Sequence, residues 1–141
     1  MGLYAGVNCS KVFEPLSERD GSAQDWGRMT RWDLMRSMQE VGVRIFIDTD
    51  AGGKGLDSLP QYMPRMVEEE KASAMEVIEM TTRIPAEAMG VADAIGSLQK
   101  GKQADMVFLP RNPLLDMTAV TSPLVVVKGG RVVDQNSTMI I

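Results

Sequence analysis

Apolar residues recur at helical spacing in one segment of this chain and form a short, nearly continuous run directly after it. Over residues 31–41 they recur at helical spacing, between an N-cap at Thr30 and a glycine at Gly42 that suits a helix end. The run that follows is of strand length and rich in β-branched and aromatic side chains. The pattern therefore predicts a helix over 31–41 and a strand over 43–47.

Two further helices are predicted after this unit. The first is capped by Asp57 or Ser58 and carries apolar residues on one face. The second begins at Ser73 or Ala74, and Pro85 interrupts it because proline has no backbone N–H to donate. A short turn follows. Residues 1–28, before all these elements, are predicted to form a long loop.

From Gly96 onward the pattern becomes that of β-structure. A strand is predicted over 104–109, and two more over 124–127 and 131–133. The last two are separated by residues 128–130, Lys-Gly-Gly, which favour a hairpin because paired glycines accept positive φ.

Two acids and two glycines follow the strand predicted over 43–47. They are Asp48, Asp50, Gly52 and Gly53. In α/β folds, groups at the carboxyl ends of parallel strands face the ligand crevice. A carboxylate there can bind a metal or take a proton from water. Asp and Gly also end strands for purely conformational reasons, and that interpretation stays open for this segment alone.

Several further segments favour the functional interpretation of this strand end, because they follow it in a characteristic order. They resemble the C-terminal part of the metal-dependent amidohydrolase superfamily, nearest to its imidazolonepropionase-like and prolidase-like members. The resemblance covers residues 30–134. It is carried by the acid–glycine segment at 48–53, by the helical segment 75–90, by Gly-Lys-Gln-Ala-Asp at 101–105, by Asn-Pro-Leu at 112–114 and by 125–133. Asp48 stands where the family usually has glycine.

The resemblance implies an α/β fold class. Residues 1–95 are expected to form the last helix–strand–helix units of a TIM-like (β/α)8 barrel. Residues 96–141 are expected to supply strands of a small β-sandwich, the composite β-domain of that family. The family builds its metal site from histidines and other ligands, and this chain has no histidine. We therefore interpret the chain as a C-terminal fragment of such an enzyme.

The resemblance also implies a chemistry. Asp50 is expected to be the catalytic carboxylate and a ligand of a divalent metal, with zinc as the expected ion. Gly52 and Gly53 are expected to let the substrate approach the backbone. The reaction would be hydrolysis of a C–N bond in an amide, cyclic amide or dipeptide-like substrate through metal-activated water. Asp48 is assigned a structural or capping role, and Lys102 with Asp105 is expected to fix a turn.

Composition limits the partners. The net charge is −4, with no basic footprint for nucleic acid, and no apolar run approaches the length of a membrane span. Cys9 is the single cysteine, which excludes a disulfide framework within the chain. We expect a cytoplasmic protein with a small-molecule substrate, and a homo-oligomer is compatible with the sequence. Two alternatives remain: a non-catalytic interaction module or inactive fragment, and an acid-rich regulatory or storage domain.

Overall fold

The computed structural model describes residues 2–8, 31–49, 59–70 and 72–135. These residues belong to two compact units, 1–59 and 60–141. The predicted division at residue 95 between a barrel part and a β-domain stays a prediction about the complete protein.

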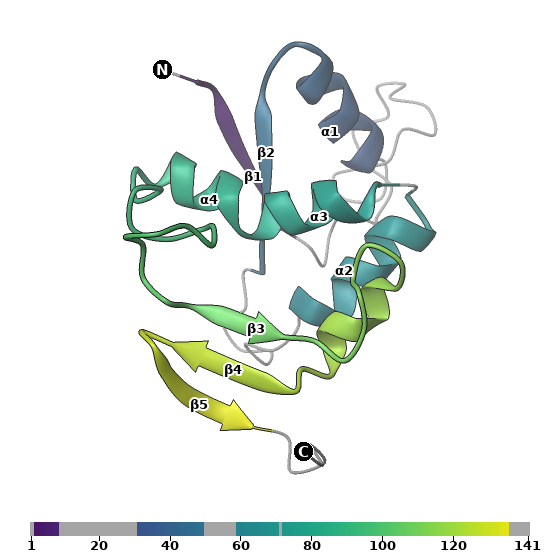
Figure 1. The fold of residues 1–141 in the computed structure, drawn as a ribbon. Helices are drawn as coiled ribbons and strands as arrows, with labels where there is room; N and C mark the ends of the chain where they lie inside the picture. Colours follow the sequence, from purple (N-terminus) through teal and green to yellow (C-terminus); the bar gives the residue numbers. More distant parts are fainter. Residues whose placement is uncertain (1, 9–30, 50–58, 71, 136–141) are drawn as a thin grey trace. The chain divides into compact units, whose positions relative to one another are not determined.

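The described part of the first unit consists of a parallel pair of strands and one helix (Figure 1). Strand β1 (Tyr4–Asn8) runs beside strand β2 (Arg44–Asp48), with Tyr4 opposite Arg44 and Asn8 opposite Asp48. Helix α1 (Arg31–Glu40) comes between them in the sequence and contacts β2. This is a βαβ unit, the building block of parallel α/β folds.

The helix and the second strand were predicted within a residue or so of their observed ends. The loop predicted over residues 1–28 is wrong at β1, because residues 4–8 form a strand. The local pattern is weak there, since the segment Tyr-Ala-Gly-Val-Asn has a glycine at its centre. Pairing with β2 supplies the order that the local sequence does not.

Gly6 has a specific steric reason to lie in β1. A Cβ at this position would lie 2.9 Å from two atoms of the Phe46 ring and 3.2 Å from a carboxylate oxygen of Asp48. The first distance is shorter than ordinary van der Waals contact. Glycine therefore lets the Phe46 side chain lie against the neighbouring strand.

Strand β2 has one covered face and one more open face. Ile45 and Ile47 are buried, whereas the alternate positions Arg44, Phe46 and Asp48 are half-buried or exposed. Helix α1 contributes two more buried side chains to the unit, Trp32 and Met35. This alternation is the period of two expected of a strand with one face toward an apolar interior.

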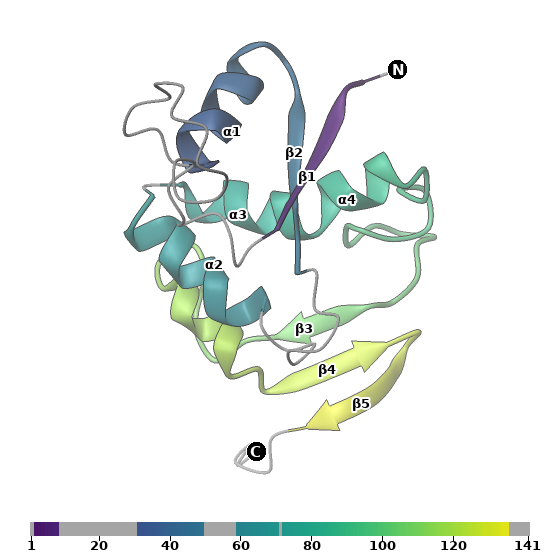
Figure 2. The same cartoon turned by 180° about the vertical axis from the view of Figure 1, so that it is seen from behind.

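Among its described residues, the second unit contains three α-helices, a 3₁₀ helix and an antiparallel sheet (Figure 2). The sheet order is β3-β4-β5. The described elements are α2 (Leu59–Glu68), α3 (Ala74–Thr81), α4 (Arg83–Ala88), β3 (Met106–Phe108), η3 (Met117–Thr121), β4 (Val125–Lys128) and β5 (Arg131–Gln135). Methionines supply a large share of its buried side chains, with Met66 and Met80 fully buried.

The predicted hairpin is confirmed. Gly129 and Gly130 have φ values of 57° and 77°, the left-handed region that glycine enters without strain. The pairing of β4 with β5 contains an irregularity: Val127 lies opposite Val132, but Val126 lies opposite Asp134. One residue of β5 therefore has no opposite number, which is the pattern of a β-bulge.

The break between α3 and α4 differs from the prediction. Helix α3 begins as expected after Ser73, whose hydroxyl accepts a hydrogen bond of 3.2 Å from the Glu76 amide. The interruption falls at Thr82, with φ −131° and ψ −78°, rather than at Pro85. Pro85 lies in the first turn of α4, where a missing N–H removes no helical hydrogen bond.

None of the helices among the described residues is long and apolar enough to cross a membrane.

The Gly6 contact leads to a stability prediction. In Gly6→Ala, the new Cβ forces the Phe46 ring to shift, and overpacking of this kind costs about 1–3 kcal/mol. Alanine recovers about 0.4–1 kcal/mol by restricting the unfolded chain. We expect the free energy of unfolding to fall by about 1–2 kcal/mol in thermal or urea unfolding.

Gly2→Ala is the matched control. The nearest atoms to a Cβ at Gly2 belong to the Tyr4 ring, at 3.5–3.6 Å, which is ordinary contact. An equal loss of stability in both variants would contradict the steric account of Gly6.

Candidate functional site

The residues expected to carry the chemistry, Asp50, Gly52 and Gly53, lie outside the described residues. Their roles therefore stay predictions. The structure describes the strand that leads toward them, β2, which ends at Asp48. The described part of the candidate site consists of the end of β2 and of its parallel neighbour β1.

One face of the parallel pair carries the polar and aromatic side chains. The Arg44 guanidinium lies over the ring of Tyr4, its register partner, at 5.6 Å from the ring centroid. Gly6 and Phe46 form the next register pair on this face, and Asp48 follows. The face of Ile45 and Ile47 is the buried one. We call the opposite face the open face of β1–β2. It is defined by Tyr4, Gly6, Arg44, Phe46 and Asp48.

Asp48 stands at the carboxyl end of this open face and is exposed to solvent. Its structural or capping role stays a prediction, because the segment from residue 50 onward lies outside the described residues. Within the described parts of the chain, no hydrogen bond or ion pair engages the Asp48 carboxylate. The sequence signal for a different role is its position alone, since the last residue of a parallel strand lies at the ligand edge.

The described residues do not fit a divalent metal. Among them, no group of three or more His, Cys, Asp or Glu side chains could hold one. A catalytic zinc site uses three protein ligands, and histidine, its commonest nitrogen ligand, is absent from the whole sequence. We therefore derive no reaction step through a metal from these residues.

Asp105 fixes a turn, as expected from the sequence. Its carboxylate accepts a hydrogen bond from the Lys128 ammonium and another, of 2.7 Å, from the Gly129 amide, 24 residues away. The Lys128 bond, followed by the Gly129 bond, holds the pKa of Asp105 below its ordinary value. Lys102 donates to the Ser97 hydroxyl at 2.7 Å. Asp105 thus anchors the β4–β5 hairpin, and Lys102 holds a bend between residues 97 and 102.

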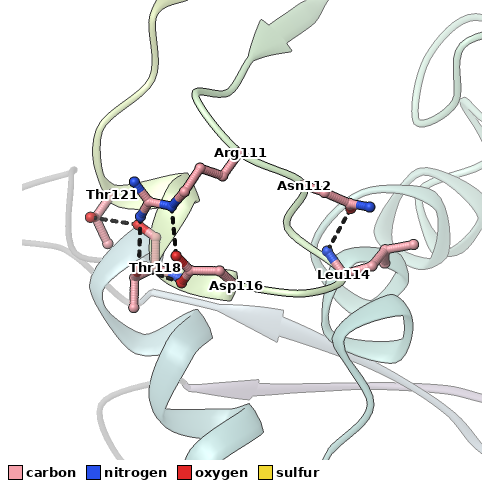
Figure 3. A network of polar contacts seen from close by, with 6 residues as sticks. All are labelled: Arg111, Asn112, Leu114, Asp116, Thr118 and Thr121. Carbon is pink, nitrogen blue, oxygen red and sulfur yellow. Dashed lines mark hydrogen bonds and ion pairs between the residues drawn. The ribbon is translucent and has the colours of Figure 1, made fainter.

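A second polar cluster shapes the loop between β3 and η3 (Figure 3). Arg111 Nε donates to Asp116 at 2.7 Å, and Asp116 accepts the Thr118 amide at 3.0 Å, which caps η3. The hydrogen bonds from Thr118 and then Arg111 lower the pKa of Asp116. Asn112 accepts the Leu114 amide at 3.0 Å, a local turn typical of asparagine. These polar groups bond one another and the backbone of their own loop.

The sequence model of the amidohydrolase family matches residues 28–133. Among curated proteins, the chain is similar to an imidazolonepropionase from Shouchella clausii (strain KSM-K16). The two are 33% identical over an alignment of 117 residues, and the match covers 79% of this chain and 26% of that protein. The chain thus spans about a quarter of the length of this relative.

The structure is also similar to solved structures of a dipeptidase and of a putative prolidase. A Xaa-Pro dipeptidase with bound methionine in its active site matches with a TM-score of 0.64 and 31% identity. That match covers 73% of this chain and 25% of the dipeptidase. A putative prolidase from Bifidobacterium longum matches with a TM-score of 0.63 and 28% identity, over 74% of this chain and 26% of the prolidase.

The Asp105 anchor gives a prediction with a defined pH dependence. Because the folded-state pKa of Asp105 is lowered, its stabilising contribution is present above the unfolded pKa and is lost as pH falls through the folded one. We expect Asp105→Asn to lower the urea midpoint at pH 7. The difference from the wild type should shrink as pH falls below 3.8, the ordinary value for Asp.

Asp93→Asn is the control for this experiment. Asp93 is exposed whereas Asp105 is half-buried, and no hydrogen bond or ion pair engages Asp93 among the described residues. The midpoint of Asp93→Asn should follow the wild type at every pH. A difference for Asp105→Asn that is independent of pH would contradict the charge-based account.

Proposed function

Because the chain belongs to the amidohydrolase family, we propose that it forms the C-terminal part of a metal-dependent hydrolase that cleaves a C–N bond. The family match spans 28–133, most of the chain, and the similar proteins are hydrolases. Membership implies a TIM-barrel-type fold. In this proposal β1 and β2 are its last two strands, and residues 96–141 belong to a β-sandwich completed by strands elsewhere in the protein.

The proposed substrate is an amide, a cyclic amide or a dipeptide-like molecule. Two similarities support this class. The curated relative is an imidazolonepropionase, and one similar structure is a Xaa-Pro dipeptidase. The names of both proteins indicate small-molecule substrates. We therefore propose a small molecule as the partner of the complete protein. The cytoplasmic location and a homo-oligomeric state stay predictions from the sequence.

Asp50 is the residue to which we assign the chemistry. The observation that supports this assignment is the parallel pairing of β1 with β2, because carboxyl ends of parallel strands face the ligand crevice and Asp50 follows β2 in the sequence. A carboxylate there can take a proton from the attacking water and return it to the leaving nitrogen.

Amidohydrolases are generally metal-dependent, and the proposal includes a divalent metal, with zinc as the expected ion. Asp50 is proposed as one ligand. The other ligands must come from outside the described residues, because these do not fit a metal. Gly52 and Gly53 are proposed to leave room for substrate beside the backbone.

One observation favours a second candidate, a non-catalytic interaction module or inactive fragment that reuses this part of the fold. The chain contains no histidine, so it lacks the ligand type on which such metal sites depend. The two candidates differ in whether the complete protein hydrolyses amides at all. Assaying that protein on a panel of dipeptides and cyclic amides separates them.

Asp50→Asn tests the catalytic assignment. The amide keeps the shape of the side chain but loses its charge and basicity. Loss of general acid–base catalysis lowers rates by about 10²–10⁴-fold. We expect kcat of the complete protein to fall by at least that range, while thermal unfolding stays unchanged. Glu40→Gln, at an exposed acid on α1, should keep full activity. A variant with more than about a tenth of wild-type kcat would remove Asp50 from the site.

The isolated 141-residue chain should not hydrolyse amides. A single carboxylate does not hold a catalytic metal, since such sites use about three protein ligands. Calorimetry with zinc and a turnover assay with added metal would measure this. Micromolar zinc affinity at a site that Asp50→Asn abolishes, or metal-dependent turnover, would refute the expectation.

A further inference from the structure

The segment between helix α4 and strand β3, residues 91–105, is not used by the proposed reaction, although it contains the Gly-Lys-Gln-Ala-Asp motif at 101–105. It forms neither an α-helix nor a strand (Figure 1). It is nevertheless closed on itself, because the Gln103 amide donates a hydrogen bond of 2.8 Å to the Ala94 carbonyl. We call residues 91–105 the linking segment.

The first part of the linking segment packs against the break between helices α3 and α4. A Cβ at Gly96 would lie 2.6 Å from the Ala86 Cβ and 3.1 Å from the Thr82 carbonyl oxygen, and Gly96 has a φ of 88°. Ala86 is buried, and Thr82 is the residue that separates α3 from α4. The Val91 amide adds a hydrogen bond of 2.9 Å to the Ala86 carbonyl. Only glycine allows this close approach of the segment to the helix break.

The last part of the linking segment is bonded to the turn of the β4–β5 hairpin. The Ala104 carbonyl accepts a hydrogen bond of 2.9 Å from the Gly130 amide. The Asp105 carboxylate accepts one of 2.7 Å from the Gly129 amide and another from the Lys128 ammonium. The turn is therefore held by backbone and side-chain acceptors from outside the hairpin.

The two attachments are close together along a short path. The bond between Gln103 and Ala94 joins the part of the segment that lies on α4 to the part that holds the hairpin. A displacement at either attachment is thus carried through hydrogen-bonded backbone rather than through a loose loop. Elements that share packing and hydrogen bonds in this way tend to open as one cooperative unit.

We propose that the linking segment is a rigid link that makes the α3–α4 break and the β4–β5 hairpin open and close together. Gly96 is its contact with the helices, and Asp105 is its contact with the hairpin. A ligand or partner that binds only the closed form of one element would then stabilise the other. The link does not depend on the proposed reaction.

Hydrogen exchange measured by mass spectrometry on the complete protein tests this link through two peptides, 83–90 and 124–135. In Gly96→Ala the added Cβ meets Ala86 and backbone, an overpacking that should raise exchange about fivefold or more. We expect the rise in both peptides. Asp105→Asn, made at the other attachment, should also raise exchange in both. Helix α1, in the first unit, should keep its wild-type exchange in each variant.

Gly101→Ala is the matched control. Gly101 has a φ of 93°, close to that of Gly96, but a Cβ there would meet no atom within 4 Å. Both substitutions strain the backbone, so the larger rise expected in Gly96→Ala measures the contact with the helix break. Combining Gly96→Ala with Ala86→Gly removes the closest atom. The rise in that double variant should be smaller than the product of the two single rises.

The location of the change decides the outcome. A rise confined to 83–90 in Gly96→Ala, or to 124–135 in Asp105→Asn, would overturn the link. An equal rise in helix α1 would also overturn it, because the whole protein would then be opening. If Gly96→Ala does not fold, Asp105→Asn decides by itself. Exchange is measured without turnover, so this result is independent of whether the protein hydrolyses amides.

Discussion

The parallel pairing of β1 with β2 is the constraint on which the site depends. It joins residues 4–8 to residues 44–48 across a long stretch of chain, and it brings both carboxyl ends to the same edge. Without this pairing, Asp48 would simply end an isolated strand, and Phe46 would have no neighbour to lie against. The register that places Gly6 opposite Phe46 also gives the open face its shape.

The parts of the fold that the sequence predicted correctly are those with strong local signals. Helix α1, strand β2 and the β4–β5 hairpin each have a clear period, a cap or a pair of glycines, and the structure places them as expected. Strand β1 was missed because its order comes from a partner about 40 residues away, through the Tyr4–Arg44 register. No pattern within five residues reports such a partner.

The sequence predicted the candidate site less completely than the fold. Family motifs indicated the position of Asp50, whereas its neighbour Asp48 was assigned a capping role that no described hydrogen bond supports. A capping role can be inferred from the neighbouring residues in the sequence. The exposure of a side chain at a strand end depends instead on tertiary packing. Which face a carboxylate occupies follows from the burial of Ile45 and Ile47, and burial depends on tertiary packing.

The bulge between β4 and β5 has a consequence for how the three-stranded sheet can grow. An extra residue in an outer strand bends and twists it, and natural sheets use this to discourage strand addition. Strand β5 carries that irregularity, whereas the short strand β3 pairs regularly with β4. The two edge strands of the described sheet therefore differ as templates for the addition of another strand. An incoming strand meets a regular ladder of donors and acceptors at β3 and a distorted one at β5, which gives assembly on this sheet a direction.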